Sequence, residues 1–145
     1  MEDSKPVNAI TTRTAMFRSR TEAWKSAREF VERFTHSAGL EREKGLKTNL
    51  VVEELFTNTV QHGHRGGSDA PIWITLKACD GHVRLVYEDN APPFNPFGRS
   101  PAELMARLAH ERREGGLGVV LAHALTASAD YVYLFGRNRI TLEVA

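Results

Sequence analysis

The chain has 145 residues, 41% of them hydrophobic and 26% charged, which is typical of a single folded domain spanning residues 1–145. A formal net charge of +1 provides no strong field for nucleic acid or an anionic membrane, and no apolar stretch is long enough to cross a bilayer. The single cysteine excludes an internal disulfide and, with an N-terminus that lacks a secretory signal pattern, favours a cytoplasmic protein.

The first elements in chain order are a strand and a helix. Residues 9–17 are rich in threonine and apolar types, which predicts an edge strand. Ser19 or Thr21 is expected to cap a helix that begins near Glu22, because both hydroxyls suit that position. Apolar residues then recur three and four apart until Gly39, where we expect the helix to end.

Residues 41–61 predict a second helix, which the glycine-rich segment 62–67 ends. Most of its circumference is expected to be apolar, through Leu46, Leu50, Val52, Leu55, Phe56 and Val60. Glu54 and Asn58 lie one helical turn apart, so their side chains share a face. A solvent-facing stripe is one interpretation. The other is a site for a hard cation with oxygen ligands, or for a hydroxyl that must lose a proton.

The second half of the chain predicts two hairpins. The β-rich runs 72–79 and 82–88 flank Asp80-Gly81, a strong two-residue turn signal. After a proline-rich segment and a loose helix at 102–111, the range 118–126 predicts a third buried helix. A second hairpin is expected over 131–135 and 139–144, around Gly136-Arg137-Asn138. This order favours an α+β fold, a two-layer sandwich with a mixed, mostly antiparallel sheet and helices on one face.

Two loops carry further candidate site residues. Asp89 ends a strand before a proline-stiffened turn, where its carboxylate could accept a hydrogen bond from the amine of adenine or simply stabilise the turn. Gly115-Gly116-Leu117-Gly118 could let backbone approach phosphate at a helix N-terminus, or could be only a helix-entry turn. The glycines follow a polar stretch rather than a strand, which excludes the dinucleotide fingerprint, and no P-loop is present.

Taken together, the three segments resemble the nucleotide-binding boxes of the ATPase superfamily that includes gyrase, histidine kinases and MutL. Glu-Leu-Phe-Thr-Asn-Thr-Val-Gln-His-Gly, from Glu54, resembles the Glu-x-x-x-Asn box of bacterial anti-sigma-factor serine/threonine kinases. The segments at 89–96 and 115–118 resemble their Asp-x-Gly-x-Pro-Phe-Asp-Pro and Gly-Gly-x-Gly boxes. The resemblance implies the Bergerat-type ATP-binding form of the two-layer sandwich.

The resemblance also implies roles for individual residues. Glu54 would be the general base, Asn58 would coordinate Mg²⁺, and Asp89 would recognise the adenine of ATP. The other matching box positions are His62, Ala91, Pro93, Gly115, Gly116, Leu117 and Gly118. Ala91 and Asn95 stand where the family usually has glycine and aspartate, and neither replaces a charged group that the mechanism requires.

The implied function is a serine/threonine kinase that uses ATP and Mg²⁺ to phosphorylate an anti-anti-sigma factor with a STAS fold. Such a kinase also holds a sigma factor or another regulator, and the resemblance suggests a homodimer, for which the N-terminal strand is one candidate surface. An ATP-binding sequestration module without kinase turnover is the main alternative. An isolated histidine-kinase catalytic domain is a third, although no helical dimerisation segment precedes the domain.

Overall fold

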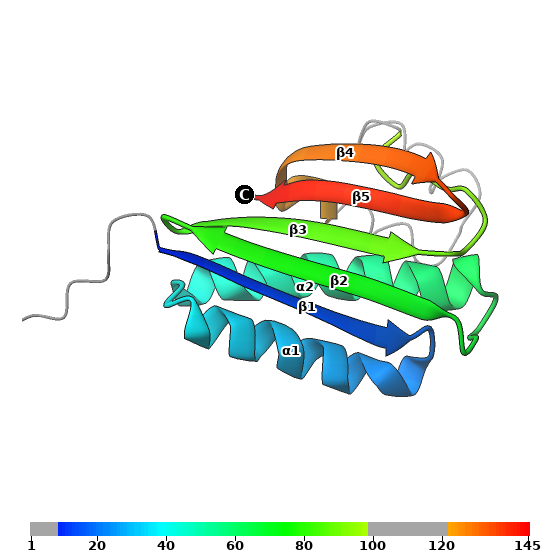
Figure 1. Ribbon diagram of the computed structural model, residues 1–145, viewed down its shortest axis with the longest axis horizontal. Helices are drawn as coiled ribbons and strands as arrows, with labels where there is room; N and C mark the ends of the chain where they lie inside the picture. The colour runs from blue at the N-terminus through cyan, green and yellow to red at the C-terminus, as the bar shows by residue number, and fades with distance from the viewer. Residues whose placement is uncertain (1–8, 99–121) are drawn as a thin grey trace, which may run out of the picture.

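A computed structural model of the chain describes residues 9–98 and 122–145. Its elements in chain order are β1 (Ile10–Arg18), a 3₁₀ turn (Thr21–Ala23), α1 (Trp24–Ser37), α2 (Arg42–Asn58), a π-helical turn (Thr59–Gly63), β2 (Pro71–Cys79), β3 (His82–Asp89), β4 (Thr126–Leu134) and β5 (Arg137–Val144). The sheet order is β1-β2-β3-β5-β4, and each of these pairings is antiparallel. Figure 1 shows α1 and α2 side by side on the same face of the sheet. The predicted α+β two-layer fold is therefore confirmed.

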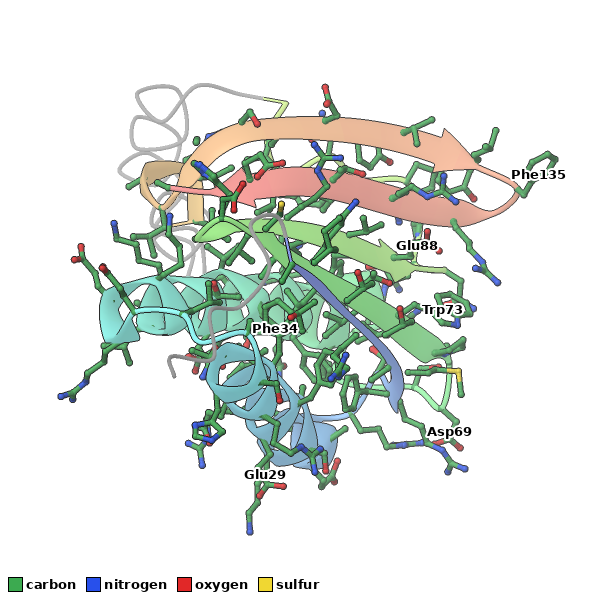
Figure 2. The ribbon with its side chains drawn as sticks, turned by 60° about the vertical axis from the view of Figure 1, so that its left-hand side comes forward. Glu29, Phe34, Asp69, Trp73, Glu88 and Phe135 are labelled. Carbon is green, nitrogen blue, oxygen red and sulfur yellow. The ribbon has the colours of Figure 1, made fainter. Side chains whose placement is uncertain are left out.

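The core lies between this sheet face and the two helices. Strands β2, β3 and β5 alternate buried and more exposed residues, as expected when one sheet face is covered. Phe30, Val31 and Phe34 of α1 and Val51, Val52, Leu55 and Phe56 of α2 join the inward strand residues in one hydrophobic cluster. In Figure 2, Phe34 points from α1 into this layer. Burying each large apolar side chain contributes about 1.5–3 kcal/mol, so this layer is what holds α2 against the sheet.

The expected cap of the first helix is wrong. The position before the 3₁₀ turn is Arg20, and no side chain caps either that turn or α1. Ser19 is fully buried, and its hydroxyl lies 2.6 Å from Nδ1 of His64. Its backbone N–H donates to the carbonyl of Ala70, which fixes Ser19 beside the start of β2 rather than at the helix entrance.

The inward face of α2 also differs from the prediction. Leu46 and Leu50 are 54% and 39% exposed, whereas Gly45, Thr48 and Val51 are buried. The other four predicted residues, Val52, Leu55, Phe56 and Val60, are buried, so the prediction is wrong only at Leu46 and Leu50. In this first part of the helix Gly45 packs closely against Thr35 of α1, a contact that an apolar count does not reveal.

Both predicted hairpins form, and each turns through two residues of positive φ. Asp80 and Gly81 have φ angles of 50° and 78°, and Phe135 and Gly136 have 53° and 77°. Positive φ at both central positions is the pattern of a type I′ turn, which matches the twist of the flanking strands. The second turn therefore comes earlier than predicted, and Asn138 lies within β5.

The predicted helix at 118–126 overlaps the described residues only from position 122. Residues 122–124 are helical, and Thr126 is already the first residue of β4, which begins five residues before the predicted strand. The loose helix expected at 102–111 lies outside the described residues. In the described part of the chain, no helix is long and apolar enough to span a membrane.

Candidate nucleotide-binding site

Glu54 and Asn58 lie one turn apart near the C-terminal end of α2, and both are partly exposed. Partial burial raises the pKa of the Glu54 carboxyl, and the negative charge of Glu53 raises this pKa further. Among the described residues, Glu54 has no ion-pair or hydrogen-bond partner. The raised pKa makes this carboxylate a stronger base than a fully solvated one. Gln61, three residues beyond Asn58, is exposed on the following turn.

A π-helical turn, Thr59–Gly63, follows Asn58 directly. The backbone N–H of His64 donates to the carbonyl of Thr59, five residues earlier, at 2.8 Å, which is the hydrogen-bond spacing of a π-helix. The chain then leaves the helix through Arg65 and Gly66, at φ angles of 50° and 102°. Such turns occur often at functional sites. Here the first residue of the turn, Thr59, is buried and carries its hydroxyl to the end of β3.

Asp89, at the end of β3, is 7% exposed, and three donors hold its carboxylate. Oδ2 accepts a hydrogen bond from the hydroxyl of Thr59 at 2.7 Å. Oδ1 accepts one from the side-chain amide of Asn138 at 2.8 Å and one from the backbone N–H of Ala91 at 3.2 Å. Burying a carboxylate is costly unless such donors satisfy its oxygens. The structure thus places the Asp89 segment directly against the end of the helix that carries Glu54 and Asn58.

Asn138 also holds the loop that follows Asp89. Its Nδ2 donates to the carbonyls of Ala91 and Pro92 at 3.0 and 3.2 Å. Its Oδ1 accepts from the backbone N–H of Phe94 at 3.0 Å and from the hydroxyl of Tyr131. Burial raises the pKa of Tyr131, so its hydroxyl keeps the proton that it donates. One carboxamide on β5 therefore fixes the shape of the loop.

The remaining box residues of this loop differ in exposure. Ala91 is 4% exposed and does not have positive φ, so it occupies the usual glycine position without backbone strain. Pro93 is exposed. Asn95 closes a local turn, because its Oδ1 accepts the backbone N–H of Phe97 at 2.9 Å.

The two histidines after Asn58 have different surroundings. His62, which matches the family box, is exposed. His64 instead lies with Nδ1 2.6 Å from the hydroxyl of Ser19 and Nε2 3.0 Å from Oδ1 of Asn90. Because the amide oxygen of Asn90 can only accept, Nε2 of His64 donates to it. His64 thereby ties the loop after Asp89 to the end of β1.

The structure brings together two of the three predicted segments. Gly115, Gly116, Leu117 and Gly118 lie outside the described residues, so their part in the site stays a prediction. The two described segments meet through Thr59 and Asp89, at one end of the sheet and beside the C-terminal end of α2.

The sequence profile of the histidine kinase-like ATPase domain matches residues 17–143. The chain belongs to this family. The predicted resemblance to the ATPase superfamily is therefore confirmed. No curated protein matches the chain.

Among solved structures, the chain is similar to the RsbU and RsbW domains of Rv1364c from Mycobacterium tuberculosis, with a TM-score of 0.64 and 17% sequence identity. The match covers 92% of this chain and 32% of that chain, so our chain spans about a third of the length of the protein it resembles. At this identity the likeness shows a shared fold.

Sequence reasoning missed four residues of this site: Thr59, Tyr87, Asn138 and His64. Two of them carried a usable signal. Tyr87 and Asp89 are two residues apart on one strand, so they share its inward face, and a threonine that follows Asn58 on a buried helix calls for a partner there. Asn138 and His64 carried none, because strand register and tertiary contact place them.

Proposed function

We propose that this protein is a serine/threonine kinase and partner-switching regulator. It would use Mg²⁺ and ATP to phosphorylate an anti-anti-sigma factor of the STAS type, and would sequester a sigma factor or another regulator. One observation carries the proposal: Glu54, a carboxylate with a raised pKa and no partner among the described residues, lies one turn from Asn58 on the helix that ends against Asp89.

The residues present fit ATP and Mg²⁺. Three donors occupy part of the acceptor capacity of the Asp89 carboxylate and leave room for a donor such as the amine of adenine. The side-chain oxygen of Asn58 is a ligand that Mg²⁺ accepts. The described residues hold no group of three His, Cys, Asp or Glu side chains, so a metal at Asn58 would complete its shell with phosphate and water.

In the proposed mechanism, bound Mg²⁺–ATP supplies the phosphoryl group and offsets its charge. Asp89 binds and orients the base, and Asn58 orients the metal. Glu54 accepts the proton of the incoming serine or threonine hydroxyl, for which its raised pKa suits it. The predicted glycine segment at 115–118 would approach the phosphates through its backbone.

A transfer assay tests the proposal. The protein is incubated with ATP, Mg²⁺ and a candidate STAS-domain antagonist, and the antagonist is analysed by mass spectrometry. Phosphoserine or phosphothreonine on the antagonist is the expected result. Nucleotide binding without transfer would favour the sequestration module, and phosphohistidine would favour a histidine-kinase catalytic domain.

Two variants test the role of Glu54 in this assay. Glu54→Ala should still bind ATP, whereas transfer should fall by roughly 10²–10⁴-fold, the usual contribution of a general base. Glu29→Gln changes an exposed carboxylate on the outer side of α1 and should leave transfer unchanged (Figure 2). Full turnover in Glu54→Ala would remove Glu54 from the role of base.

A homodimer in the cytoplasm belongs to the same proposal. Strand β1 is the candidate surface, because it lies at one edge of the sheet and pairs only with β2 among the described strands. An edge strand offers unpaired backbone groups to a second chain.

A further inference from the structure

The buried surroundings of Asp89 include a short chain of hydroxyl groups. The hydroxyl of Tyr87 lies 2.6 Å from the hydroxyl of Thr59, which lies 2.7 Å from Oδ2 of Asp89. All three residues are at most 7% exposed. Both hydroxyls also lie near the carbonyl of Leu55, at 3.0 Å from Thr59 and 3.1 Å from Tyr87.

Two hydroxyl protons cannot serve all four contacts, and one arrangement keeps the two shortest. The carboxylate of Asp89 can only accept, so Thr59 must donate to it at 2.7 Å. The oxygen of Thr59 then faces the oxygen of Tyr87 at 2.6 Å, and only a proton from Tyr87 makes that contact favourable. Burial raises the pKa of Tyr87 well above its ordinary value, so the phenol keeps this proton. The carbonyl of Leu55 meanwhile accepts the backbone N–H of Thr59.

This arrangement leaves one acceptor position on the carboxylate. Two carboxylate oxygens offer about four lone-pair sites. Oδ1 receives donors from Asn138 and Ala91, and Oδ2 receives one donor from Thr59. The remaining position is therefore on Oδ2, and its direction is fixed because Thr59 holds the same oxygen.

We propose that Thr59 is a positioning residue that sets the base selectivity of this site, with Tyr87 fixing the direction in which Thr59 donates. Through Thr59, the last acceptor of Asp89 faces a purine that carries an exocyclic amine, and a purine with an oxygen at that position is rejected. The inference rests on the proposed function, because it takes the ligand of Asp89 to be an adenine nucleotide.

The chemistry of the two purines explains the expected selectivity. An amine at the six position of the base donates to the open position on Oδ2. An oxygen there places two acceptors against each other in a buried site, which leaves both unsatisfied. Without Thr59, the carboxylate keeps donors on Oδ1 alone, can turn about its last bond, and discriminates less between the two bases.

The experiment measures the dissociation constants of ADP and IDP by isothermal titration calorimetry on the full chain. Thr59→Val has nearly the same shape as threonine but cannot donate, and Tyr87 can then donate to the carbonyl of Leu55. We expect Thr59→Val to lose about tenfold in ADP affinity, as for one hydrogen bond to a charged group, and less in IDP affinity. The ratio of the two constants should therefore fall by several-fold.

Further variants distinguish a positioning role of Thr59 toward Asp89 from a role in packing alone. Thr59→Ser keeps the donor and should keep the ADP-to-IDP ratio, even if the melting temperature falls. Tyr87→Phe should lower the ratio less than Thr59→Val does. If Thr59→Val does not fold, as judged by circular dichroism, Thr59→Ala replaces it, with the same expected loss of selectivity.

The outcomes are distinct. A folded Thr59→Val protein with the wild-type ratio overturns the role of Thr59 and leaves the proposed nucleotide site intact. A wild-type protein that binds neither ADP nor IDP overturns the proposed function, and the inference with it. Equal loss of both nucleotides in Thr59→Val and Thr59→Ser shows a packing role only and also overturns the inference.

Discussion

Gly63 lies so close to Ala91 that a Cβ atom on Gly63 would stand 2.7 Å from the Cβ atom of Ala91. Gly63 ends the π-helical turn after the helix that carries Glu54, and Ala91 is the second residue of the loop after Asp89. The missing side chain at position 63 therefore lets the two proposed nucleotide-binding segments meet. Ala91 is buried in this contact, so its methyl group fills the space that Gly63 leaves.

Gly63→Ala should therefore push the two segments apart. Overpacking of this kind typically destabilises a protein by about 1–3 kcal/mol. We expect a lower melting temperature and weaker ADP binding, measured by differential scanning calorimetry and titration calorimetry. The double variant Gly63→Ala with Ala91→Gly exchanges the two methyl positions and should recover most of both losses. Additive losses in the double variant would show that the contact does not set the loop position.

The raised pKa of Glu54 predicts a pH dependence of phosphoryl transfer. A base must be deprotonated, so transfer should rise with pH, with its midpoint above the ordinary carboxyl value of 4.5. Because the charge of Glu53 contributes to the raised pKa, Glu53→Gln should move the midpoint to lower pH. The measurement is the initial rate of antagonist phosphorylation across pH. A midpoint that stays in place in Glu53→Gln would mean that another group is being titrated.

The raised pKa of Glu54 also predicts how this residue affects the stability of the fold. A carboxyl whose pKa is higher in the folded protein than in the unfolded chain destabilises the fold as pH rises through that pKa. Glu54→Gln should therefore melt no lower than the wild type at pH 7, and the difference between the two should shrink at acidic pH. This distinguishes Glu54 from a structural carboxylate, whose loss lowers the melting temperature at neutral pH. Thermal unfolding by circular dichroism at several pH values tests it.

The periodic elements of this fold could be predicted from the sequence. The edge strand at β1, the two helices and the Asp80-Gly81 turn each follow from local patterns that tertiary packing did not override. The exposure of Leu46 and Leu50 on α2 could not be predicted, because both are as apolar as the residues that face the core. Gly45 packs closely against Thr35 of α1 in this part of the helix, and one sequence does not reveal a close approach between helices.

The candidate site was predictable only in part. Glu54, Asn58 and Asp89 stand out because charged or amide groups on apolar elements call for partners. Of the residues that fix Asp89, Asn138 does not stand out. It lies on β5, and only its pairing with Asp89 in the sheet register brings the two side chains together, while Thr59 reaches Asp89 from the end of the helix. The sequence thus indicates the groups that could contact a ligand, and the fold reveals the groups that hold them.

Gly45 gives a second prediction about close packing. A Cβ atom at this position would stand 2.4 Å from Cγ2 of Thr35 on α1. Alanine usually stabilises a helix relative to glycine by roughly 0.8–1 kcal/mol, but here Gly45→Ala should lower the melting temperature, because the clash separates the helices. Thr35→Ser removes the clashing methyl and keeps the hydroxyl that donates to the carbonyl of Val31. The double variant should melt above Gly45→Ala alone.

The turn between β4 and β5 offers a stabilising substitution. Phe135 has a φ angle of 53° and is 94% exposed, and Figure 2 shows it projecting from the tip of the hairpin. An L-residue other than asparagine, aspartate or glycine is strained in this conformation, and the exposed ring gains little from burial. Phe135→Asn should raise stability by roughly 0.5–1 kcal/mol, since asparagine favours this turn position. Phe135→Ala also removes the ring but keeps the strained backbone, so it should give little or no gain. Thermal unfolding of the two variants separates the effect of relieving backbone strain from the effect of removing the ring. Equal melting temperatures of Phe135→Asn and Phe135→Ala would contradict backbone strain at position 135.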